Sequence, residues 1–468
     1  MRLTLEQRAV VDFILAAEED QIILIDAVAG AGKTSLLTEI VRLVDHTQGT
    51  YIAYNKSVAM EAATKFPSSI ACSTAHSLAY RAVVKQLGLR IGSFSYRDIK
   101  ERIPYENRLD IIDTLKEFCL SSYTDVDAFA EETELSEQQH TLCSKYLNLM
   151  YEGKIECTHD FYMKAFHMHL ADGSITYPKQ DFLLVDEAGD LNEVTLAIFK
   201  LLPAKIKIAV GDSAQNIYAF NHTVNAFHIL KDVGTSFRLT ESFRVSEEIA
   251  ERIERFCLTN ISEDMNFKGQ KLENENITTR AFIARTNAGL ISAMIELMLE
   301  NTDFSLVRRA SDIFRLPLTM CFLKHNGTIN DPAYKHLQSD VDQWYEDPTL
   351  RVSFKSPHMY LASLYEFDVA LMSAIRLVMT KGKATVLSAY DFAKANEKRQ
   401  TNLFLATSHS VKGLEFDEVT ILEDLNDTVH KVLYPETPVS DETREQEVNL
   451  YYVACSRARK ILNNARLL

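Results

Sequence analysis

The feature that most constrains the fold is a glycine-rich turn placed between an apolar run and a helical pattern. The apolar run covers residues 21–26, the turn covers residues 27–32, and the helical pattern begins at Lys33. A second apolar run follows at residues 50–54. This order of strand, loop, helix and strand is typical of a parallel sheet with helices on its faces.

The turn itself has the composition of a phosphate-binding loop. Residues 27–34 read Ala-Val-Ala-Gly-Ala-Gly-Lys-Thr, with alanine where the common pattern starts with glycine. Backbone N–H groups of such a loop surround a phosphate at the N-terminus of the helix. Lys33 is then expected to reach the terminal phosphates of ATP, and the Thr34 hydroxyl to bind Mg²⁺. The other nucleotide-binding candidates of this segment are Ala29, Gly30, Ala31, Gly32 and Ser35. The alternative interpretation is a tight turn with a surface lysine.

A pair of carboxylates follows a later apolar run. Residues 182–185 read Phe-Leu-Leu-Val and lead directly into Asp186 and Glu187. Ligands of open α/β sheets bind at the carboxyl ends of the strands, where these two side chains are expected. Asp186 can hold Mg²⁺, and Glu187 can polarise the water that attacks the γ-phosphate. Alone, such a pair also fits an acidic helix N-cap, but the upstream loop favours the catalytic interpretation.

Two stretches with an α/β pattern are each interrupted by a region of helical pattern. We therefore predict an α/β fold with two RecA-like P-loop NTPase domains, each with a parallel sheet and one mainly helical insertion. The predicted bounds are 1–79 with 170–235 for the first domain, 80–169 for its insertion, 236–301 with 400–468 for the second domain, and 302–399 for its insertion.

Composition narrows the class of protein. The chain has 468 residues, of which 46% are hydrophobic and 25% charged, as in globular proteins. No apolar run approaches the roughly 18 residues that cross a bilayer. Seven scattered cysteines without a C-x-x-C pair argue against a disulfide framework or a zinc site. The start of the chain is polar rather than signal-like, so we expect a cytoplasmic protein, in a bacterium or in a host cell if viral. The net charge of −15 taken alone disfavours a nucleic-acid partner.

Further segments follow one another in a fixed order along the chain. They are Leu-Glu-Gln at 5–7, Tyr-Ile-Ala-Tyr-Asn-Lys at 51–56, Ser-Thr-Ala-His-Ser-Leu at 73–78, a segment at 210–220, Leu-Thr-Glu-Ser-Phe-Arg at 239–244, a segment at 407–417 and Asn-Leu-Tyr-Tyr-Val-Ala-Cys-Ser-Arg-Ala at 449–458. With the loop and the carboxylate pair, this series resembles the UvrD/PcrA/Rep branch of superfamily 1 DNA helicases, most closely the F-box DNA helicase-like subgroup. The resemblance covers almost the whole chain.

The resemblance implies roles for several residues at the nucleotide. Gln7 would read the adenine edge, and Phe243 would stack on the adenine ring. Gln215 would sense the γ-phosphate, and Arg244 and Arg457 would act as arginine fingers. With Lys33 and Glu187, these last three form the predicted catalytic set, and ATP is expected in the cleft between the two domains.

The resemblance also implies a path for single-stranded DNA. Glu415 lies in the segment that, in the family, contacts both the nucleotide and the DNA backbone. The predicted DNA contacts are Tyr54, Asn55, Lys56, Thr74, His76, Tyr218, Phe220, Thr407, His409 and Lys412. Core packing is the alternative for Tyr218 and Phe220, and a structural role is the alternative for His76 and His409.

The predicted function is that of an ATP-dependent DNA helicase that moves along single-stranded DNA and unwinds duplex. The resemblance implies 3′-to-5′ movement, a role in DNA replication, repair or recombination, and single-stranded or forked DNA as partner. A monomer without membrane contact is expected, with a replication or repair protein as a further partner. Gly189 stands where the family has glutamine, which puts coupling in doubt. The alternatives are a translocase that strips proteins from DNA with little unwinding, and a regulatory DNA-binding subunit switched by ATP.

Overall fold

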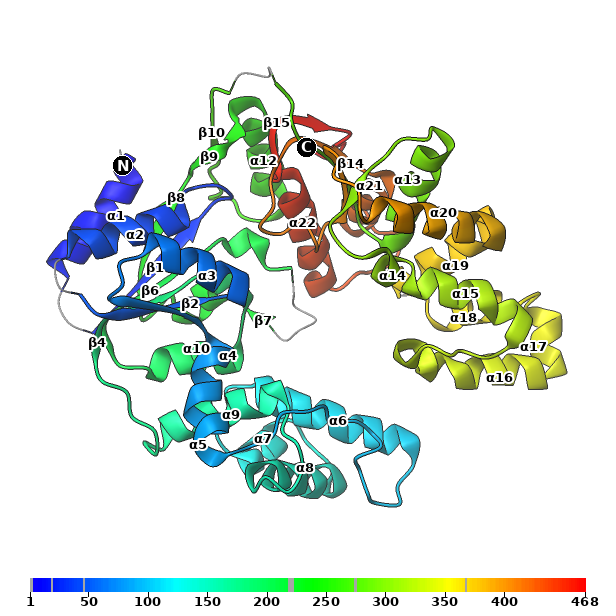
Figure 1. The fold of residues 1–468 in the computed structure, drawn as a ribbon, viewed down its shortest axis with the longest axis horizontal. Coiled ribbons are helices and arrows are strands. Elements are labelled where there is room, and N and C mark those ends of the chain that lie inside the picture. Colours follow the sequence, from blue (N-terminus) through cyan, green and yellow to red (C-terminus); the bar gives the residue numbers. More distant parts are fainter. Residues whose placement is uncertain (1–2, 18–19, 45–46, 218–222, 273–275, 367) are drawn as a thin grey trace. The chain divides into compact units, whose positions relative to one another are not determined.

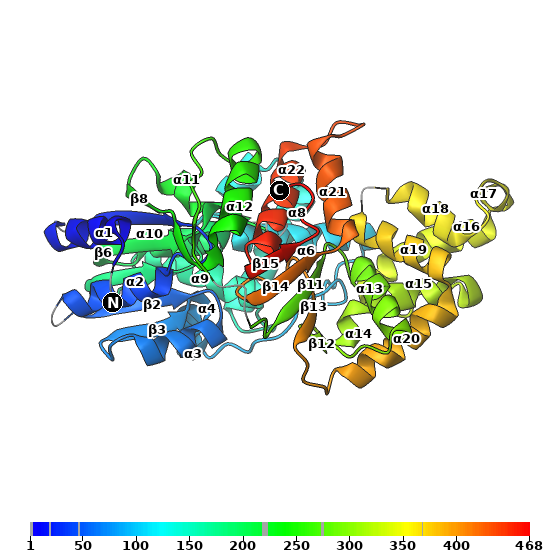
Figure 2. The same cartoon turned by 90° about the horizontal axis from the view of Figure 1, so that it is seen from above.

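The chain forms two compact units, Met1–Phe243 (unit 1) and Arg244–Leu468 (unit 2). The computed structural model describes residues 3–17, 20–44, 47–217, 223–272, 276–366 and 368–468. Both units contain a parallel sheet with helices (Figures 1 and 2). The predicted α/β fold with two parallel sheets is therefore confirmed.

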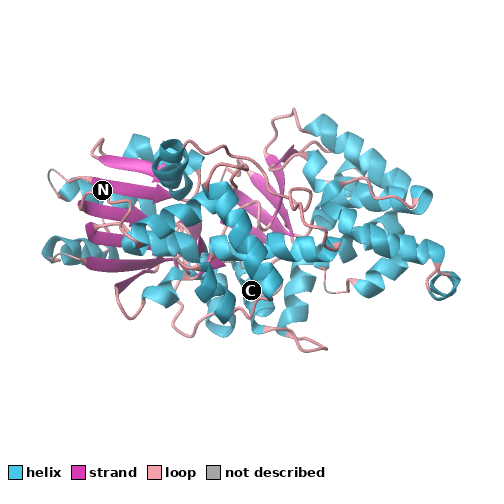
Figure 3. Ribbon diagram, turned by 90° about the horizontal axis from the view of Figure 1, so that it is seen from below, coloured by secondary structure: helices cyan, strands magenta, loops and turns pink. Residues whose placement is uncertain are grey.

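Unit 1 is built on a six-stranded sheet in the order β3-β2-β4-β6-β1-β8, in which every neighbouring pair is parallel. Figure 3 shows the strands of the structure in magenta among the helices in cyan. Most strands of the unit 1 sheet are short and apolar, as expected for a parallel sheet covered by helices. They are β1 (Gln21–Ala27), β2 (Gly49–Ala53), β3 (Ile70–Thr74), β4 (Gln180–Val185), β6 (Ala204–Gly211) and β8 (Thr235–Leu239). The helices next to these strands in sequence are α1 (Leu5–Ala16), α2 (Lys33–Leu43), α3 (Lys56–Lys65), α10 (Glu193–Leu201) and α11 (Ala226–Leu230).

The insertion of unit 1 is helical and shares its core with the sheet. It contains α4 (Ala75–Ala79), a π-helical turn (Tyr80–Val84), α5 (Lys85–Leu87), α6 (Tyr105–Leu120), α7 (Val126–Glu132), α8 (Glu137–Tyr151) and α9 (His159–Ala171). One continuous cluster of buried side chains joins Ile52 and Leu183 of the sheet to Phe118 and Phe166 of the insertion. The insertion is thus part of the folded body of unit 1, as expected for a segment inserted between two strands of one sheet.

Unit 2 has a five-stranded parallel sheet in the order β12-β13-β11-β14-β15. Its strands are β11 (Arg280–Ala284), β12 (Ser305–Leu306), β13 (Leu403–Thr407), β14 (Phe416–Ile421) and β15 (Ala458–Asn463). The helices near the sheet in sequence are α12 (Glu247–Asn260), α13 (Asn287–Leu299), α21 (Glu423–Leu433) and α22 (Asp441–Cys455). A small two-stranded ladder joins β9 (Glu241–Ser246) and β10 (Lys268–Gln270).

The insertion of unit 2 is also helical, and part of it has a core of its own. Its elements are α14 (Ala310–Ile313), α15 (Arg315–Asn326), a 3₁₀ segment (Pro332–Leu337), α16 (Gln338–Glu346), α17 (Pro348–Ser353), α18 (Pro357–Leu364), α19 (Val369–Lys381) and α20 (Lys383–Asn396). Met320, Val341 and Leu361 belong to a buried cluster separate from the one that contains Leu405 of the sheet. No helix in the part of the chain described above is long and apolar enough to span a membrane.

The boundary between the units differs from the one predicted. We expected the second domain to begin at residue 236, but β8 pairs in parallel with β1 of the first sheet, from Ile23↔Thr235 to Ala27↔Leu239. The units therefore divide at Phe243 and Arg244. The reason is that residues 235–239 alternate exposed and buried positions at the sheet edge, so the strand lacks the apolar run that marks its neighbours.

Candidate functional site

The glycine-rich turn forms a loop between β1 and α2, as predicted. Gly30 and Gly32 have φ angles of 79° and 75°, a conformation that only glycine adopts at little cost. A Cβ atom on Gly32 would also lie 3.5 Å from the ring of Phe243. The helix begins immediately afterwards at Lys33, followed by Thr34. The loop thus leads into a helix N-terminus, where backbone N–H groups and the helix dipole favour a phosphate.

Three side-chain and main-chain groups hold the carbonyls of this loop. Gln7, which is 1% exposed, donates from Nε2 to Ala31 O at 3.1 Å. Ser242 Oγ donates to Ala29 O at 2.7 Å, and the N–H of Phe243 donates to Gly30 O at 2.9 Å. Because the C=O and N–H of a trans peptide point in opposite directions, these bonds turn the following N–H groups toward the other side of the loop. The arrangement orders the loop before any phosphate binds.

Gln7 is also tied to its own helix. Its Oε1 accepts from the N–H of Thr4 at 3.2 Å, within a capping box at the start of α1. The preceding Glu6 accepts from both N–H and Oγ1 of Thr240 at 2.6 Å. The first turn of α1 therefore positions the loop and the segment that carries Phe243. Reading of an adenine edge by Gln7 stays a prediction.

Two carboxylates lie at the end of β4, where they were expected. Asp186 is 7% exposed and its Oδ2 accepts from the hydroxyl of Tyr51 on β2 at 2.6 Å. Its Oδ1 accepts from the N–H of Glu187 at 2.9 Å. Glu187 has a φ of 53°, so a non-glycine residue occupies the left-handed region at this point. That strained backbone turns the chain at the strand end.

The electrostatics of Asp186 suit a cation. Burial and the neighbouring charge of Glu187 raise the pKa of Asp186, whereas Lys33 and the hydrogen bond from Tyr51 lower it. Burial raises the pKa of Tyr51, so its hydroxyl remains a proton donor. A buried carboxylate disfavoured as an anion gains most from a bound divalent ion. Asp186 and Thr34 could supply the oxygen ligands that Mg²⁺ prefers. Among the described residues, no group of three or more His, Cys, Asp or Glu side chains is placed to hold a metal ion.

Gln215 lies in the turn that follows β6. It is 4% exposed, and its Nε2 donates to Asp212 Oδ2 at 2.7 Å. The same turn is bonded to β1, because Ser213 donates from N–H and Oγ to Asp26 at 2.9 and 2.8 Å. The end of the strand before the phosphate loop and the turn with Gln215 are therefore linked directly.

Gly189 packs against this turn. A Cβ atom built on Gly189 would lie 2.9 Å from Asp212 O, closer than real Cβ contacts. Gly211 is equally crowded, with Ala188 N at 2.8 Å from its Cβ position. The two glycines allow the segments after β4 and β6 to touch through their backbones. This close approach gives a structural reason for glycine at position 189.

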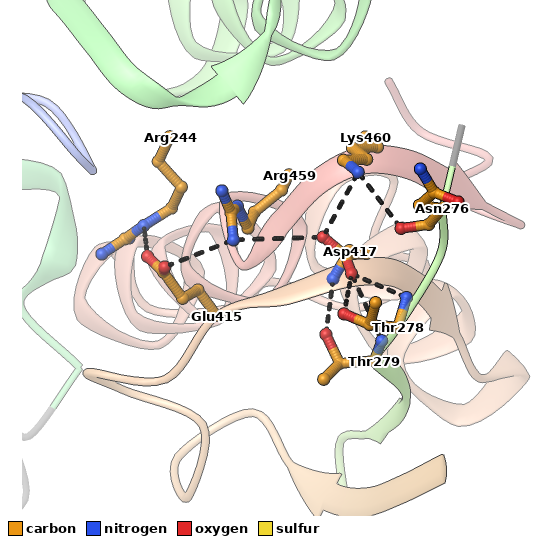
Figure 4. Close-up of polar contacts among 8 residues, drawn as sticks. All are labelled: Arg244, Asn276, Thr278, Thr279, Glu415, Asp417, Arg459 and Lys460. Atoms are coloured by element: carbon orange, nitrogen blue, oxygen red, sulfur yellow. Dashed lines mark hydrogen bonds and ion pairs between the residues drawn. The ribbon is translucent and has the colours of Figure 1, made fainter. Parts of the chain in front are cut away.

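In unit 2, Arg244 and Glu415 form an ion pair (Figure 4). Arg244 Nε lies 2.7 Å from Glu415 Oε2, and Arg459 Nη1 lies 3.9 Å from Glu415 Oε1. Glu415 precedes β14 and Arg459 lies on β15, which pairs with β14. The structure thus brings together two of the predicted nucleotide-contacting residues, and adds Arg459, which the sequence did not single out.

Arg457 lies next to this group in sequence but is 1% exposed. Its Nε donates to Val453 O at 2.9 Å and its Nη2 to Ser456 Oγ at 3.1 Å. These bonds fix the guanidinium at the end of α22. Its role as an arginine finger stays a prediction.

The predicted DNA contacts of unit 1 gather at the ends of β2 and β3. These strands pair from Gly49↔Ile70 to Ala53↔Thr74, so the segments that start at Tyr54 and Thr74 are neighbours. The side chains of Asn55 and Thr74 cap α3 and α4, while Tyr54 is 51% exposed and Lys56 is exposed.

His76 follows in α4 with its ring at an exposed position. The ring packs edge-on against Tyr162 and His159 of α9, with centroids 5.7 and 6.1 Å apart. These contacts give His76 a structural role besides the predicted DNA contact. Tyr218 and Phe220 lie outside the described residues.

The predicted DNA contacts of unit 2 lie in the turn after β13. Ser410 Oγ accepts from the N–H of Thr407 at 2.9 Å, and Gly413 has a φ of 85°. Burial and the charges of Arg285 and Arg308 lower the pKa of His409 to about 4, so its ring is neutral at pH 7. Lys412 belongs to the same turn, which leads to Glu415.

Comparisons with known proteins agree with this arrangement. Residues 7–221 match a family model described as an AAA domain, and residues 366–463 match the UvrD-like helicase C-terminal domain. Both matches support the predicted resemblance to the UvrD-like superfamily 1 helicases. The first match contains the phosphate loop and the carboxylate pair, and the second contains Glu415 and Arg457.

Two curated relatives of this UvrD-like chain are F-box helicases. The chain is 28% identical to F-box DNA helicase protein 1 of Schizosaccharomyces pombe, over 99% of the chain and 57% of the relative. It is 24% identical to F-box DNA helicase 1 of Gallus gallus, over 99% of the chain and 49% of the relative. The chain therefore spans about half the length of these relatives. The predicted resemblance to the F-box helicase-like subgroup is confirmed.

Proposed function

We propose that the chain is an ATP-dependent DNA helicase that moves along single-stranded DNA and unwinds duplex. The observation that carries this proposal is that unit 1 combines a preordered phosphate loop with a carboxylate pair, of which Asp186 is buried. Unit 2 adds an arginine–glutamate pair and a second set of predicted DNA contacts on a separate parallel sheet. The printed names of both relatives, which are DNA helicases, support the same function.

Each residue has a proposed part in ATP hydrolysis. The loop N–H groups and Lys33 would bind the phosphates. Thr34 and Asp186 would hold Mg²⁺, and the ion would supply positive charge that stabilises the phosphate oxygens. Glu187 accepts a proton from the attacking water, and Gln215 contacts the γ-phosphate. Arg244 and Arg457 stabilise the charge of the transition state, an effect worth about 10³–10⁵ in rate for an arginine finger.

The turn 408–415 of unit 2 is the proposed link between the nucleotide state and the DNA contacts. It follows Thr407, a predicted DNA contact at the end of β13, and ends at Glu415, which is paired with Arg244. Because Ser408 is buried and bonded to Ala284 O at 2.9 Å, one end of the turn is fixed on the sheet. Displacement of Arg244 toward a nucleotide phosphate would release Glu415 at the other end. DNA contact would then depend on nucleotide state.

The proposal also includes the direction of movement along DNA and the cellular process in which the protein acts. We propose 3′-to-5′ movement on single-stranded or forked DNA, by a monomer, in replication, repair or recombination. A bacterial or host-cell cytoplasm is the proposed location, with a replication or repair protein as partner. These parts derive from the family resemblance, and direction is tested with duplexes that carry either a 3′ or a 5′ single-stranded tail.

Strand displacement tests the proposal against its alternatives. A fluorescently labelled duplex with a 3′ tail should be separated by the wild-type chain with ATP, and by neither wild type without ATP nor the Lys33→Ala variant. DNA-stimulated ATP hydrolysis without strand separation would instead support a translocase that strips proteins from DNA. DNA binding without turnover would support the ATP-switched regulatory subunit. Gly189, which replaces the glutamine of the family, is the feature that favours the regulatory subunit. Its close packing against Asp212 gives a different reason for the glycine, one that requires no loss of ATP turnover, and so disfavours this alternative.

A further inference from the structure

The short edge strand β12 places one arginine beside the predicted DNA-contacting turn of unit 2. β12 pairs in parallel with β13, with Ser305 opposite Phe404 and Leu306 opposite Leu405. The N–H of Val307 donates to Leu405 O at 3.3 Å, so the register extends beyond the strand. Continued by two residues, it sets Arg308 opposite Thr407. The chain after β12 and the turn after β13 therefore leave the same edge of the sheet together.

Arg308 has no carboxylate partner among the described residues. Its side chain is exposed, and no ion pair involves it among the residues that the structure describes. Arg285, which follows the neighbouring strand β11, differs in this respect. Its guanidinium forms two 2.6 Å hydrogen bonds with Glu447, which is buried. Of these two arginines, Arg308 is the one whose charge is available to an anionic ligand.

The charge of Arg308 affects the pKa values of two other side chains. Arg308 contributes to the lowered pKa of His409 in the turn after β13, after burial and Arg285. It also opposes the burial that raises the pKa of Tyr334 in the insertion. The ring of Tyr334 is half-buried and has the Arg315 guanidinium 6.0 Å from its centroid. The charge of Arg308 is thus felt both in the predicted DNA turn and at Tyr334 of the insertion.

Unpaired cations next to aromatic rings are the chemistry that binds single-stranded nucleic acid, because the cations bind phosphates and the rings stack on bases. We propose that Arg308 binds a phosphate of single-stranded DNA next to Thr407. This inference rests on the proposed function. It adds a DNA contact from a segment outside the helicase motifs.

The test is the salt dependence of oligonucleotide binding. Fluorescence anisotropy of a labelled oligo-dT strand gives the dissociation constant of wild type and Arg308→Ala between 0.05 and 0.3 M NaCl. One lost phosphate contact on a single strand reduces the slope of log K against log salt by about 0.7. Taken from a 1 M reference, this weakens binding roughly fourfold at 0.15 M and roughly eightfold at 0.05 M.

Arg376→Ala is the matched control. Arg376 is also an exposed arginine of the insertion, on α19, without an ion pair among the described residues. The Arg376→Ala variant loses the same charge as Arg308→Ala. We expect its slope of log K against log salt and its affinity for oligo-dT to equal those of wild type. ATP hydrolysis without DNA should be the same in all three proteins, which also shows that they are folded.

The outcomes separate this inference from the function on which it rests. A reduced slope in Arg308→Ala alone supports the phosphate contact. A wild-type slope in Arg308→Ala, or equal losses in both variants, overturns it while the proposed function stands. Absence of oligo-dT binding by the wild type overturns both.

Discussion

Replacement of Gly189 by alanine tests how the segments after β4 and β6 are joined. The new Cβ would lie 2.9 Å from Asp212 O, whereas ordinary contacts begin near 3.4 Å. The nearest atom belongs to the backbone, so no side chain can rotate away. Overpacking of this kind costs about 1–3 kcal/mol. At about 2–4 °C per kcal/mol for a unit of this size, a cost of about 2 kcal/mol lowers the melting temperature by about 4–8 °C.

The same displacement should reach the catalytic turn. Asp212 O accepts from the N–H of Gln215 at 3.0 Å, and the Asp212 carboxylate holds its Nε2 at 2.7 Å. We therefore expect Gly189→Ala to reduce kcat for DNA-stimulated ATP hydrolysis by about tenfold, equivalent to about 1.4 kcal/mol. Gly189→Gln, which restores the residue of the family, should be impaired at least as much because it carries the same Cβ.

Gly173→Ala is the control for this prediction. Its Cβ would meet no atom within 4 Å, but its φ of 77° disfavours any side chain. Differential scanning fluorimetry should therefore show a lower melting temperature for Gly173→Ala too, while its kcat stays at the wild-type value. Wild-type melting temperature and kcat in Gly189→Ala would refute the close approach as the reason for glycine. Improved turnover in Gly189→Gln would show instead that a lost glutamine limits coupling.

Three further predictions concern buried charges. Arg285→Ala leaves Glu447 buried without its partner, so fluorimetry should show destabilisation of about 3–5 kcal/mol, and Arg285→Ala/Glu447→Ala should recover part of it. Tyr51→Phe removes the hydrogen-bond donor to Asp186, and a hydrogen bond to a charged group contributes about 1.5 kcal/mol. The Mg²⁺ concentration for half-maximal ATP hydrolysis should therefore rise about tenfold. An unchanged Mg²⁺ requirement would contradict this prediction. Burial and a nearby lysine lower the pKa of His167 to about 4. The unfolded state therefore binds the proton first, and stability should fall as pH drops from about 6.5 to 4, less so in His167→Gln.

The sequence was most informative where one segment carries both a strand and its chemistry. The loop of residues 27–34 and the pair Asp186–Glu187 follow apolar runs buried on both faces, so their position at strand ends could be predicted. β8 and β12 could not be predicted in this way. β8 is an edge strand with alternating burial, and β12 has only two residues, so neither produces an apolar run.

Contacts between segments far apart in the chain could not be predicted from the sequence either. The bond from Tyr51 to Asp186 joins residues 135 positions apart, and the bonds from Glu6 to Thr240 join residues 234 positions apart. Such pairs depend on strand order, which residue spacing does not encode. Arg459 was missed for a related reason, since its proximity to Glu415 follows from the pairing of β14 with β15.

The most direct test of the account is ATP hydrolysis measured with and without single-stranded oligonucleotide. Three proteins should be compared, namely wild type, Lys33→Ala, and Arg244→Ala. We predict strong stimulation by DNA in the wild type and near-complete loss of activity in Lys33→Ala. Arg244→Ala should still bind ATP but hydrolyse it about 10³-fold or more slowly, as expected for a lost arginine finger. Equal rates with and without DNA in the wild type would contradict the proposal that this chain is an ATP-driven motor that moves along DNA.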